Sequence, residues 1–268
     1  MMQNNISIII PVLNEEESIS NVINSIRKRL PQIEIVVVND GSTDSTLQKI
    51  SNHDVHVINH PQCLGYGTAL RTGIEFSKKD YVLFCDGDGQ HRAEDIENII
   101  EHCKNYDMFV GARGKDSHRQ LNRVFGKAIL SYFANILLGK KVLDLNSGLR
   151  IVRKDIINKY LHLMPHGFSF STTSTFALIK DNRSIKWVTI TTVNRVGKSS
   201  VHQIRDGTSI LLLMLRLSIL FEPLKIFMFS SVILFLFTIT SFIINTYIMG
   251  ELNICLLYTS DAADEVQC

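Results

Sequence analysis

The sequence predicts an α/β protein with a mostly parallel sheet and helices on both faces, followed by a C-terminal transmembrane helix. Short apolar runs alternate with segments of helical periodicity from Ile6 to Val110, which is typical of repeated βαβ units. Near the C-terminus, Ile226–Met249 is long enough to cross a bilayer as a helix and contains no Asp, Glu, Lys or Arg. The 268 residues are enough for one α/β domain and an appendage.

Five apolar strands are predicted in the N-terminal half of the chain. They cover Ile6–Val12, Ile33–Val38, Val55–Ile58, Tyr81–Cys85 and Tyr106–Val110. The helices between them are expected to begin after Asn14 as an N-cap, after Ser42 or Thr43, after Gly65 and at Ala93. This alternation predicts that neighbouring strands are parallel, and in such sheets ligands bind beyond the carboxyl ends of the strands.

The second half of the chain is less regular. Its predicted elements are a helix over Gln120–Leu138, a strand over Leu145–Val152, a helix over Ser171–Lys180 and a strand over Ile185–Val193. Ile204–Phe221 carries a long apolar stripe that Arg205 and Arg216 interrupt. Its position before the spanning segment favours a helix lying in the membrane interface, and a core helix is the alternative.

The overall composition does not indicate a strongly charged partner. The formal net charge is +2 and the isoelectric point is about 8.2, so nucleic-acid binding is not expected. The five cysteines show no paired or metal-ligand spacing, which fits free thiols in a reducing compartment. The N-terminus has no basic region before its first apolar stretch, so no signal peptide is expected.

Two acids follow the predicted strand Tyr81–Cys85. Asp86 and Asp88 are two residues apart, and like charges this close are costly unless a cation lies between them. Hard oxygen ligands suit Mg²⁺ or Mn²⁺, and a solvated Asp-Gly turn is the alternative. His91 is interpreted as a cap of the following helix, with a place beside the metal as the alternative.

Two further strand ends carry polar turns, Asn14-Glu15 and Asn39-Asp40-Gly41. Because the carboxyl ends of parallel strands lie at one edge of a sheet, these turns and the acidic turn should lie along the same edge. The three turns together predict one ligand site.

Seven short motifs occur in order along the chain. They are Pro11-Val12-Leu13-Asn14-Glu15, Val38-Asn39-Asp40-Gly41-Ser42, Gly65-Tyr66-Gly67-Thr68-Ala69-Leu70, Asp86-Gly87-Asp88-Gly89-Gln90-His91, Gly111-Ala112-Arg113, Ser147-Gly148-Leu149-Arg150 and Arg195-Val196-Gly197-Lys198-Ser199. With this series, from about Ile6 to Met249, the chain resembles family-2 glycosyltransferases of the GT-A fold, which is Rossmann-like. Within that family it is similar to the polyprenyl-phosphate glycosyltransferases, such as the dolichyl-phosphate mannose synthases and their undecaprenyl-phosphate relatives.

The resemblance implies a metal-dependent hexosyltransferase whose donor is a nucleotide sugar linked to UDP or GDP. The residues implied in donor binding are Pro11, Asn14, Glu15, Asp40, Gly41, Gly65, Gly67 and Asp86. Asp86, Asp88 and Gln90 would hold Mg²⁺ or Mn²⁺ on the diphosphate, where the ion offsets the charge of the departing group. The catalytic residues implied are Asp86, Asp88, Arg113, Arg150, Arg195 and Lys198.

The resemblance also implies that the acceptor is a polyprenyl phosphate, either undecaprenyl or dolichyl phosphate. The residues implied in binding its phosphate are Arg113, Ser147, Arg150, Arg195, Lys198 and Ser199. The lipid phosphate would displace the nucleoside diphosphate at the anomeric carbon with inversion. Many family-2 enzymes carry a candidate acidic base where this chain has no acid over Phe168–Thr175, which favours a phosphate over a sugar hydroxyl as acceptor.

Two alternatives stay open. One is a family-2 enzyme that acts on a sugar hydroxyl in polysaccharide or glycolipid synthesis, although the sequence has no Gln-x-x-Arg-Trp-type run of the processive synthases. The other is a non-catalytic nucleotide-binding membrane protein. The non-catalytic alternative is disfavoured because it would leave the Asp-x-Asp pair and four candidate phosphate-binding cations without a use.

The expected organisation is a glycosyltransferase domain over 1–200, an interfacial region over 201–223, a transmembrane helix over 224–250 and a tail over 251–268. The tail includes Leu256–Cys268, which reads like translated adapter sequence at the end of a truncated chain. Basic residues precede the span and Glu251 is the nearest charge after it, so the positive-inside rule places the catalytic domain in the cytoplasm.

Overall fold

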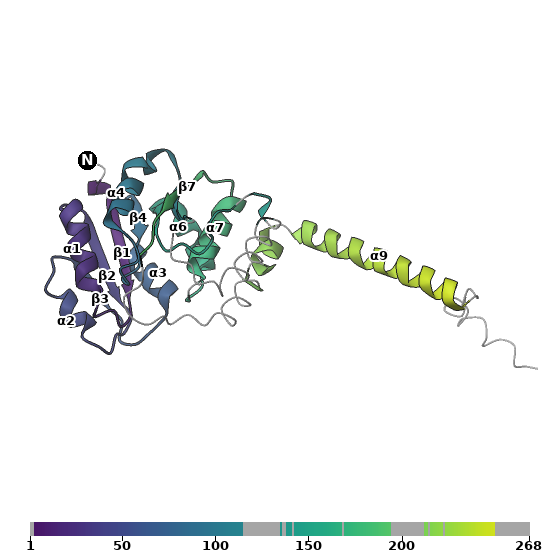
Figure 1. The fold of residues 1–268 in the computed structure, drawn as a ribbon, viewed down its shortest axis with the longest axis horizontal. Coiled ribbons are helices and arrows are strands. Elements are labelled where there is room, and N and C mark those ends of the chain that lie inside the picture. The colour runs from purple at the N-terminus through teal and green to yellow at the C-terminus, as the bar shows by residue number, and fades with distance from the viewer. Residues whose placement is uncertain are drawn as a thin grey trace, which may run out of the picture. The chain divides into compact units, whose positions relative to one another are not determined.

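The computed structural model describes residues 3–114, 135, 138–140, 142–167, 169–193, 212–213, 215–221 and 223–249. The chain divides into two compact units, Met1–Leu217 and Ser218–Cys268, and each has its own architecture. The first unit is built on a sheet and the second contains one long helix (Figure 1).

Seven strands form a single sheet in the first unit, in the order β3-β2-β1-β4-β6-β5-β7. The strands are β1 (Ile6–Val12), β2 (Glu34–Asn39), β3 (His56–Asn59), β4 (Tyr81–Phe84), β5 (Met108–Arg113), β6 (Arg150–Arg153) and β7 (Ile185–Ile190). Neighbours from β3 to β4 are parallel, as are β5 and β7, whereas β6 runs antiparallel to both β4 and β5. The predicted mostly parallel α/β sheet is therefore confirmed.

Helices cover both faces of this sheet. They are α1 (Ile19–Arg29), α2 (Thr46–Ile50), α3 (Tyr66–Phe76), α4 (Ala93–His102), α6 (Lys154–Tyr160) and α7 (Phe170–Lys180), with short 3₁₀ turns at Gln3–Asn5, Cys103–Asn105 and Leu161–Leu163. The apolar sides of α1 and α4 share one core with Ile8 and Leu83, while α3 lies on the other face with Gly73 against Ile9. On that second face Phe84 and Phe170 stack edge to face at 5.6 Å between ring centroids.

The register of the strands brings the predicted polar turns to one edge. Val12 pairs with Asn39, so β1 and β2 end side by side, and the Asp40 amide donates to the Val12 carbonyl at 2.9 Å. Phe84 pairs with Arg150, so the turn before β6 lies beside the turn after β4. The antiparallel direction of β6 is what carries its N-terminal turn to this edge.

Most of the predicted elements are present with shifted ends, and the caps predicted for the first two helices are wrong. The first helix begins at Ile19 with Ser18 in the N-cap position, because Asn14 has a φ of 55° and belongs to the preceding turn. Helix α2 begins at Thr46 after Ser45 and not after Ser42 or Thr43. The helix predicted over Ser171–Lys180 is confirmed as α7.

One predicted strand is shorter than expected, and two predicted helices lie largely or partly outside the described residues. The strand predicted over Leu145–Val152 is shorter, since only its end belongs to β6 and the preceding residues form a turn. The predicted helix over Gln120–Leu138 lies almost entirely outside the described residues. The interfacial helix predicted over Ile204–Phe221 falls partly outside them, and the tail over 251–268 wholly so.

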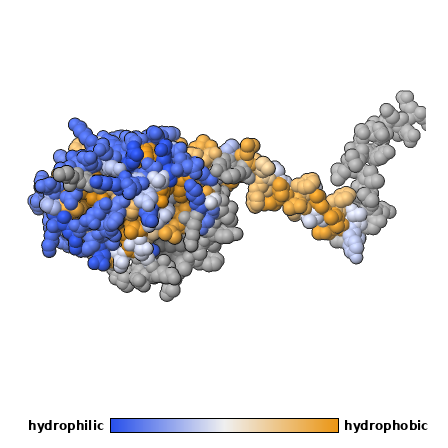
Figure 2. All heavy atoms as spheres, turned by 90° about the horizontal axis from the view of Figure 1, so that it is seen from above, coloured by the Kyte–Doolittle hydropathy of each residue, from blue (hydrophilic) through white to orange (hydrophobic). Residues whose placement is uncertain are grey.

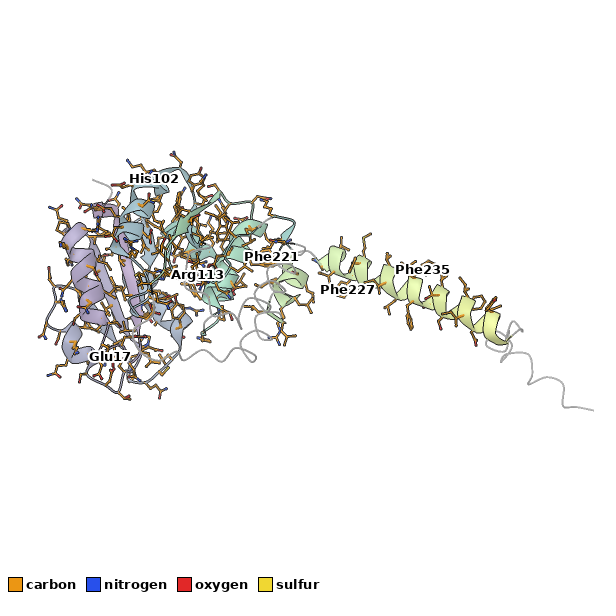
Figure 3. The ribbon with its side chains drawn as sticks, viewed as in Figure 1. Glu17, His102, Arg113, Phe221, Phe227 and Phe235 are labelled. Atoms are coloured by element: carbon orange, nitrogen blue, oxygen red, sulfur yellow. The ribbon has the colours of Figure 1, made fainter. Side chains whose placement is uncertain are left out.

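The second unit contains α9 (Pro223–Met249), an apolar helix of 27 residues. Its segment Ile226–Tyr247 has 22 residues and a mean hydropathy of 2.3, which is long and apolar enough to cross a membrane. Apolar side chains are exposed all along it (Figure 2), and Phe227 and Phe235 point away from its axis (Figure 3). In length and composition this agrees with the span predicted over Ile226–Met249.

Candidate functional site

The turn after β4 places the Asp86 carboxylate between three different parts of the chain. Tyr66 at the start of α3 donates its hydroxyl to Oδ1 of Asp86 at 2.9 Å. On the other side, Nε2 of His91 lies 3.4 Å from Oδ2. The backbone of Gly148 lies directly against the carboxylate, so that a Cβ added there would overlap it. The Asp86 side chain is nevertheless 29% exposed, so it can meet a ligand.

The charge state of this carboxylate follows from its neighbours. Burial acts to raise the pKa of Asp86, but the His91 ring, the Tyr66 hydroxyl and the charge of Arg113 outweigh it and lower the pKa. Burial and the Asp86 charge together raise the pKa of Tyr66 well above its usual value of 10.0. At neutral pH, Asp86 is therefore an anion and Tyr66 is a protonated donor.

Contacts to β1, α1 and the segment after β7 fix the rest of the acidic turn. Ser18 donates its hydroxyl to the Gly87 carbonyl at 2.7 Å, and a Cβ added at Gly87 would lie 2.6 Å from Cγ1 of Val12. The buried Asp88 accepts the Gln90 amide at 3.1 Å, and the Gln90 carbonyl accepts the Val193 amide at 3.2 Å.

His91 does not cap α4 as predicted. The N-cap position belongs to Arg92. Both ring nitrogens of His91 are buried and make no hydrogen bond among the described residues, and the ring faces Asp86. The ring therefore lies beside the acidic turn, and the alternative, a place beside the metal, stays a prediction.

The donor set of this turn fits a hard divalent cation that completes its shell elsewhere. Carboxylate and amide oxygens are the ligands that Mg²⁺ and Mn²⁺ prefer, and Mg²⁺ usually takes few protein ligands beside substrate phosphates and water. Among the described residues, no group of three or more His, Cys, Asp or Glu side chains is arranged to hold a metal ion alone. Asp86, Asp88 and Gln90 would thus supply part of the shell, and a diphosphate the remainder.

The turns after β1 and β2 are joined to each other by hydrogen bonds. Oδ1 of Asn14 accepts the Thr43 amide at 2.8 Å, and the Asn14 amide donates to the Ser42 hydroxyl at 3.0 Å. The buried Glu15 donates its amide to the Thr46 hydroxyl at 2.9 Å. Pro11 pairs with Val38 within the sheet just below these turns. Asn14 and Glu15 thus lie beside the Asp40 turn, as their positions at strand ends predict.

Asp40 binds the loop that precedes α3. Its buried carboxylate accepts the amides of Leu64 and Gly65 at 2.9 and 2.8 Å, and the His60 ring lies 2.8 Å from Oδ1. Burial acts to raise the pKa of Asp40, but the hydrogen bonds from His60, Leu64 and Gly65 lower it. Gly41, with a φ of 73°, lies against the same loop, since a Cβ there would lie 2.5 Å from the Gln62 carbonyl carbon.

The two glycines that flank Tyr66 also pack against backbone. Gly65 has a φ of 101°, and a Cβ there would lie 2.6 Å from the His166 carbonyl oxygen. A Cβ added at Gly67 would overlap the Pro165 carbonyl. The His166 carbonyl accepts the amides of Gly67 and Thr68 at 2.6 and 3.2 Å, so it occupies the N-terminus of α3.

Arg113 and Arg150 are the two described arginines of the motif series, and they have different environments. Arg113 is the last residue of β5 (Figure 3) and forms a two-pronged ion pair with Asp144, from Nε and Nη2, at 2.6 and 2.8 Å. This pairing lowers the pKa of Asp144 although burial acts to raise it. The Arg113 side chain is 31% exposed, so it can reach solvent at this edge.

Arg150 is completely buried, with 0% exposure. Its guanidinium donates to the carbonyls of Ser147, Leu145 and Ser171 and to the hydroxyls of Ser174 and Thr175. Burial lowers the pKa of Arg150 to about 10, so it stays charged at neutral pH. Arg195, Lys198 and Ser199, the other residues predicted to bind the acceptor phosphate, lie outside the described residues.

A family assignment follows from comparison with known proteins. The model of glycosyl transferase family 2 matches residues 7–161, more than half of the chain. The chain belongs to glycosyl transferase family 2. This matched region holds the acidic turn, the turns after β1 and β2, Arg113 and Arg150.

Family-2 relatives match most of the chain. The undecaprenyl-phosphate mannosyltransferase of Micrococcus luteus is 26% identical over 208 residues, covering 72% of this chain and 86% of the relative. The polyprenol monophosphomannose synthase of Mycolicibacterium smegmatis is 28% identical over 219 residues, covering 75% and 83%. Glucosyl-3-phosphoglycerate synthase from Mycobacterium tuberculosis, solved with Mn²⁺, UDP and glucosyl-3-phosphoglycerate, has a TM-score of 0.63 at 20% identity, covering 80% of both chains. That likeness shows the fold alone.

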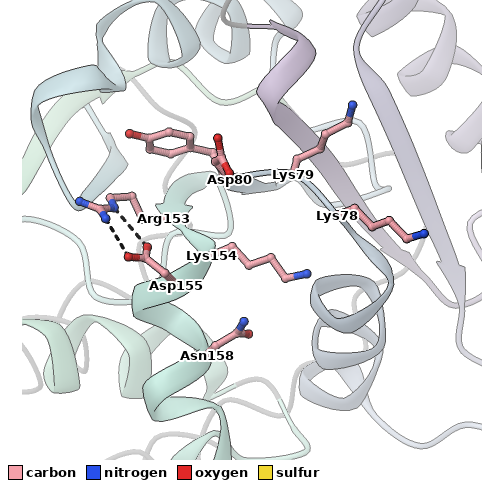
Figure 4. Close-up of a pocket in the computed structure, with 8 residues that line it drawn as sticks. Lys78, Lys79, Asp80, Arg153, Lys154, Asp155 and Asn158 are labelled. Carbon is pink, nitrogen blue, oxygen red and sulfur yellow. Dashed lines mark hydrogen bonds and ion pairs between the residues drawn. The ribbon is translucent and has the colours of Figure 1, made fainter.

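A cavity of about 570 Å³ lies away from this family-2 site, at the opposite end of β4 (Figure 4). It is lined by Lys78, Lys79, Asp80, Tyr81, Arg153, Lys154, Asp155 and Asn158. Two of its charges neutralise each other, because Arg153 donates to both Asp155 oxygens at 3.1 and 2.7 Å.

Several contributors to the site were not predicted from the sequence. The sequence presents Tyr66 only as part of a glycine-rich helix start, and it gives Asp144 no predicted role although this acid lies close before the Ser147–Arg150 motif. It gives no role to the α7 hydroxyls that hold Arg150 either. A tyrosine between two glycines and an acid just before an arginine motif are the signals that could have found the first two.

Proposed function

We propose that this family-2 glycosyltransferase transfers a sugar from a nucleotide donor to a polyprenyl phosphate, with inversion at the anomeric carbon. The observation that carries the acceptor is the similarity, over 72% and 75% of the chain, to relatives named undecaprenyl-phosphate mannosyltransferase and polyprenol monophosphomannose synthase. A helix long and apolar enough to span a membrane supports an acceptor that resides in a bilayer.

The donor nucleotide is proposed to bind along the edge where β1, β2 and β4 end. Asn14, Glu15 and Asp40 would line its nucleoside end, with Pro11, Gly41, Gly65 and Gly67 shaping the backbone around it. The Asp40 carboxylate already accepts the Leu64 and Gly65 amides, so the loop before α3 is ordered before the nucleotide base binds beside it. Either UDP or GDP fits this proposal.

The metal is proposed to be Mg²⁺ or Mn²⁺, held by Asp86, Asp88 and Gln90 on the donor diphosphate. When bound, such an ion stabilises negative charge on the departing nucleoside diphosphate. The chain itself supplies an ionised Asp86 whose two oxygens face Tyr66 and His91, so the carboxylate is oriented before any ligand arrives. Asp88 is oriented by its bond to the Gln90 amide.

Two kinds of cation are proposed on the acceptor side. Arg195 and Lys198, with Ser199, would contact the lipid phosphate, and Arg113 could join them from its partly exposed position. Arg150 has no exposed surface, so we propose that it acts indirectly by holding the turn of Ser147 and Gly148 against Asp86. The lack of any Asp or Glu over Phe170–Lys180 supports a phosphate nucleophile, which is already anionic.

The membrane arrangement is proposed from the charges that flank the span. Arg205, Arg216 and Lys225 precede the apolar segment that begins at Ile226, so the catalytic domain over 1–200 would lie in the cytoplasm, with an interfacial region over 201–223 and a transmembrane helix over 224–250. Protease treatment of sealed inverted vesicles tests this orientation. Digestion of the catalytic domain is expected, and complete protection would contradict the proposal.

A donor screen tests the activity directly. Membranes containing the full chain are incubated with undecaprenyl phosphate and a panel of labelled UDP- and GDP-sugars, and the lipid product is extracted into organic solvent. At least one donor is expected to label the extract, and Asp88→Ala membranes serve as the matched control. No labelled lipid with any donor of either nucleotide would contradict the proposed function.

A further inference from the structure

Tyr66 occupies a position in the site that the proposed function does not use. It is the first residue of α3, twenty positions before Asp86, and its hydroxyl donates to Oδ1 of Asp86 at 2.9 Å. The contact therefore joins the start of α3 to the acidic turn after β4. Tyrosine can make it because its hydroxyl stands at the end of a long rigid ring.

The backbone around Tyr66 fixes where its ring begins. Gly65 and Gly67 on either side lie so close to the carbonyls of His166 and Pro165 that a side chain fits at neither position. The His166 carbonyl also accepts the Gly67 and Thr68 amides at 2.6 and 3.2 Å. The start of α3 is thus held against the segment before α7, and this fixes the Tyr66 hydroxyl next to Oδ1 of Asp86.

The partners of Asp86 restrict the carboxylate from each side. Tyr66 holds Oδ1, the His91 ring faces Oδ2 at 3.4 Å, and the backbone of Gly148 lies against the carboxylate as well, while 29% of the side chain stays exposed to a ligand. A phenol is an uncharged hydrogen-bond donor. It orients the carboxylate without offsetting its negative charge, whereas a lysine or arginine would offset that charge.

We propose that Tyr66 is a positioning residue, which orients Asp86 for the divalent cation and donor diphosphate. This inference rests on the proposed function, because it assumes that Asp86 meets a metal. Hydrogen-bond partners of metal-ligating groups commonly change metal affinity by about 10- to 100-fold when they are removed. Tyr66→Phe removes the hydroxyl alone and keeps the ring, so it isolates this contact.

Binding of Mn²⁺, followed by electron paramagnetic resonance of the free ion, tests the inference without relying on turnover. The full chain in detergent is titrated with Mn²⁺ in the presence of UDP and, separately, of GDP. Tyr66→Phe is expected to bind Mn²⁺ about 10-fold more weakly than the wild type. The matched control is Tyr160→Phe, because Tyr160 hydrogen-bonds Asp181 at the far end of α7, away from the acidic turn.

A double-mutant cycle with Asp86→Asn shows whether Tyr66 acts through Asp86. In the Asp86→Asn background, Tyr66→Phe is expected to change Mn²⁺ affinity less than twofold. If Tyr66→Phe also destabilises the fold, the single and the double variant share that destabilisation. The cycle compares the effect of Tyr66→Phe on Mn²⁺ affinity with and without the Asp86 carboxylate, so it still shows whether Tyr66 acts through Asp86.

The outcomes separate the inference from the function on which it rests. Wild-type protein that binds no Mn²⁺ with either nucleotide would overturn the metal site and the inference together. Wild-type protein that binds Mn²⁺, with Tyr66→Phe binding equally tightly, would overturn the inference and leave the proposed function standing. Losses that add fully in the double mutant would likewise overturn it, since Tyr66 would then act independently of Asp86.

Discussion

The acidic turn after β4 and the arginine at the start of β6 are neighbours in the sheet, yet they are built in opposite ways. Asp86 keeps part of its surface open and accepts a hydrogen bond from Tyr66 of another segment. Arg150 has no open surface and donates only to uncharged oxygens of its own chain among the described residues. Both residues belong to motifs of the same family, so motif membership does not distinguish a ligand-binding residue from one that supports it.

The difference also indicates how the site separates its charges. A buried cation without a carboxylate partner in contact is costly, and its pKa falls to about 10 for that reason. Its charge nevertheless lies close enough to Asp86 and Asp144 for those groups to raise its pKa in part. Arg150 thus supports the turn that packs against Asp86 from the buried side, whereas Arg113 keeps part of its surface exposed.

The largest expected effect belongs to Asp88. Asp88→Ala should lower kcat/KM for glycosyl transfer by about 10³-fold or more, because several kcal/mol of charge stabilisation would be lost. The same change should lower the free energy of unfolding by about 1 kcal/mol or more, because the Gln90 amide loses its acceptor. Near-normal transfer by the folded variant in metal-free buffer would remove Asp88 from the site.

Replacing Arg150 should affect the stability of the fold more than replacing Asp88 does. Arg150→Met should lower the free energy of unfolding by about 3 kcal/mol, since several buried carbonyls and hydroxyls lose their donor. Denaturant unfolding of the detergent-solubilised chain measures this. Arg153→Met is the matched control, because that arginine of the same strand is 45% exposed and should cost less than about 1 kcal/mol. Equal losses for the two variants would show that Arg150 is not a core residue.

Gly148 joins the two regions, so a change there tests their contact. Gly148→Ala places a Cβ in the space of the Asp86 carboxylate and should lower kcat by about 10²-fold through displacement of that group. Gly167→Ala is the control, because a Cβ at Gly167 would meet no atom within 4 Å. Full activity of Gly148→Ala would mean that the orientation of Asp86 does not matter for transfer.

The smallest expected effect concerns pH and Asp40. The pKa of Asp40 in the fold lies below its ordinary value of 3.8, so its contribution to stability is complete above that value and disappears as the pH falls through the lower one. Asp40→Asn should therefore be less stable than the wild type at pH 7, with the difference shrinking under acid conditions. Thermal unfolding across this pH range measures both chains. If the difference in stability between Asp40→Asn and the wild type stayed constant with pH, the ionised Asp40 carboxylate would not be what stabilises the fold.

Much of the fold could be predicted from the sequence, because β1, β2 and β4 carry strong apolar patterns and end in polar turns. The direction of β6 could not, since an apolar run reads the same for either direction and its partners are chosen by tertiary packing. That direction is what brings Gly148 to Asp86. Asn14 followed by three glutamates matches a helix cap, but its left-handed backbone places it in a turn instead.

The parts of the site that consist of neighbouring residues in the sequence could be predicted, whereas the contacts between distant segments could not. The Asp86–Gln90 turn stands out by its own composition. The contact from Tyr66, the ion pair of Arg113 with Asp144 and the hydroxyls around Arg150 each join segments far apart in sequence. The motif that contains Arg150 therefore predicted that this residue binds a phosphate, whereas its complete burial is visible only in the folded chain.

The choice of acceptor tests the central claim most directly. Membranes containing the full chain are given one active labelled nucleotide sugar and either undecaprenyl phosphate or undecaprenol, the free alcohol of equal length. Labelled lipid is expected with the phosphate alone, because α7 carries no acidic residue to activate a hydroxyl and the phosphate is already anionic. Equal transfer to the free alcohol would contradict a phosphate acceptor.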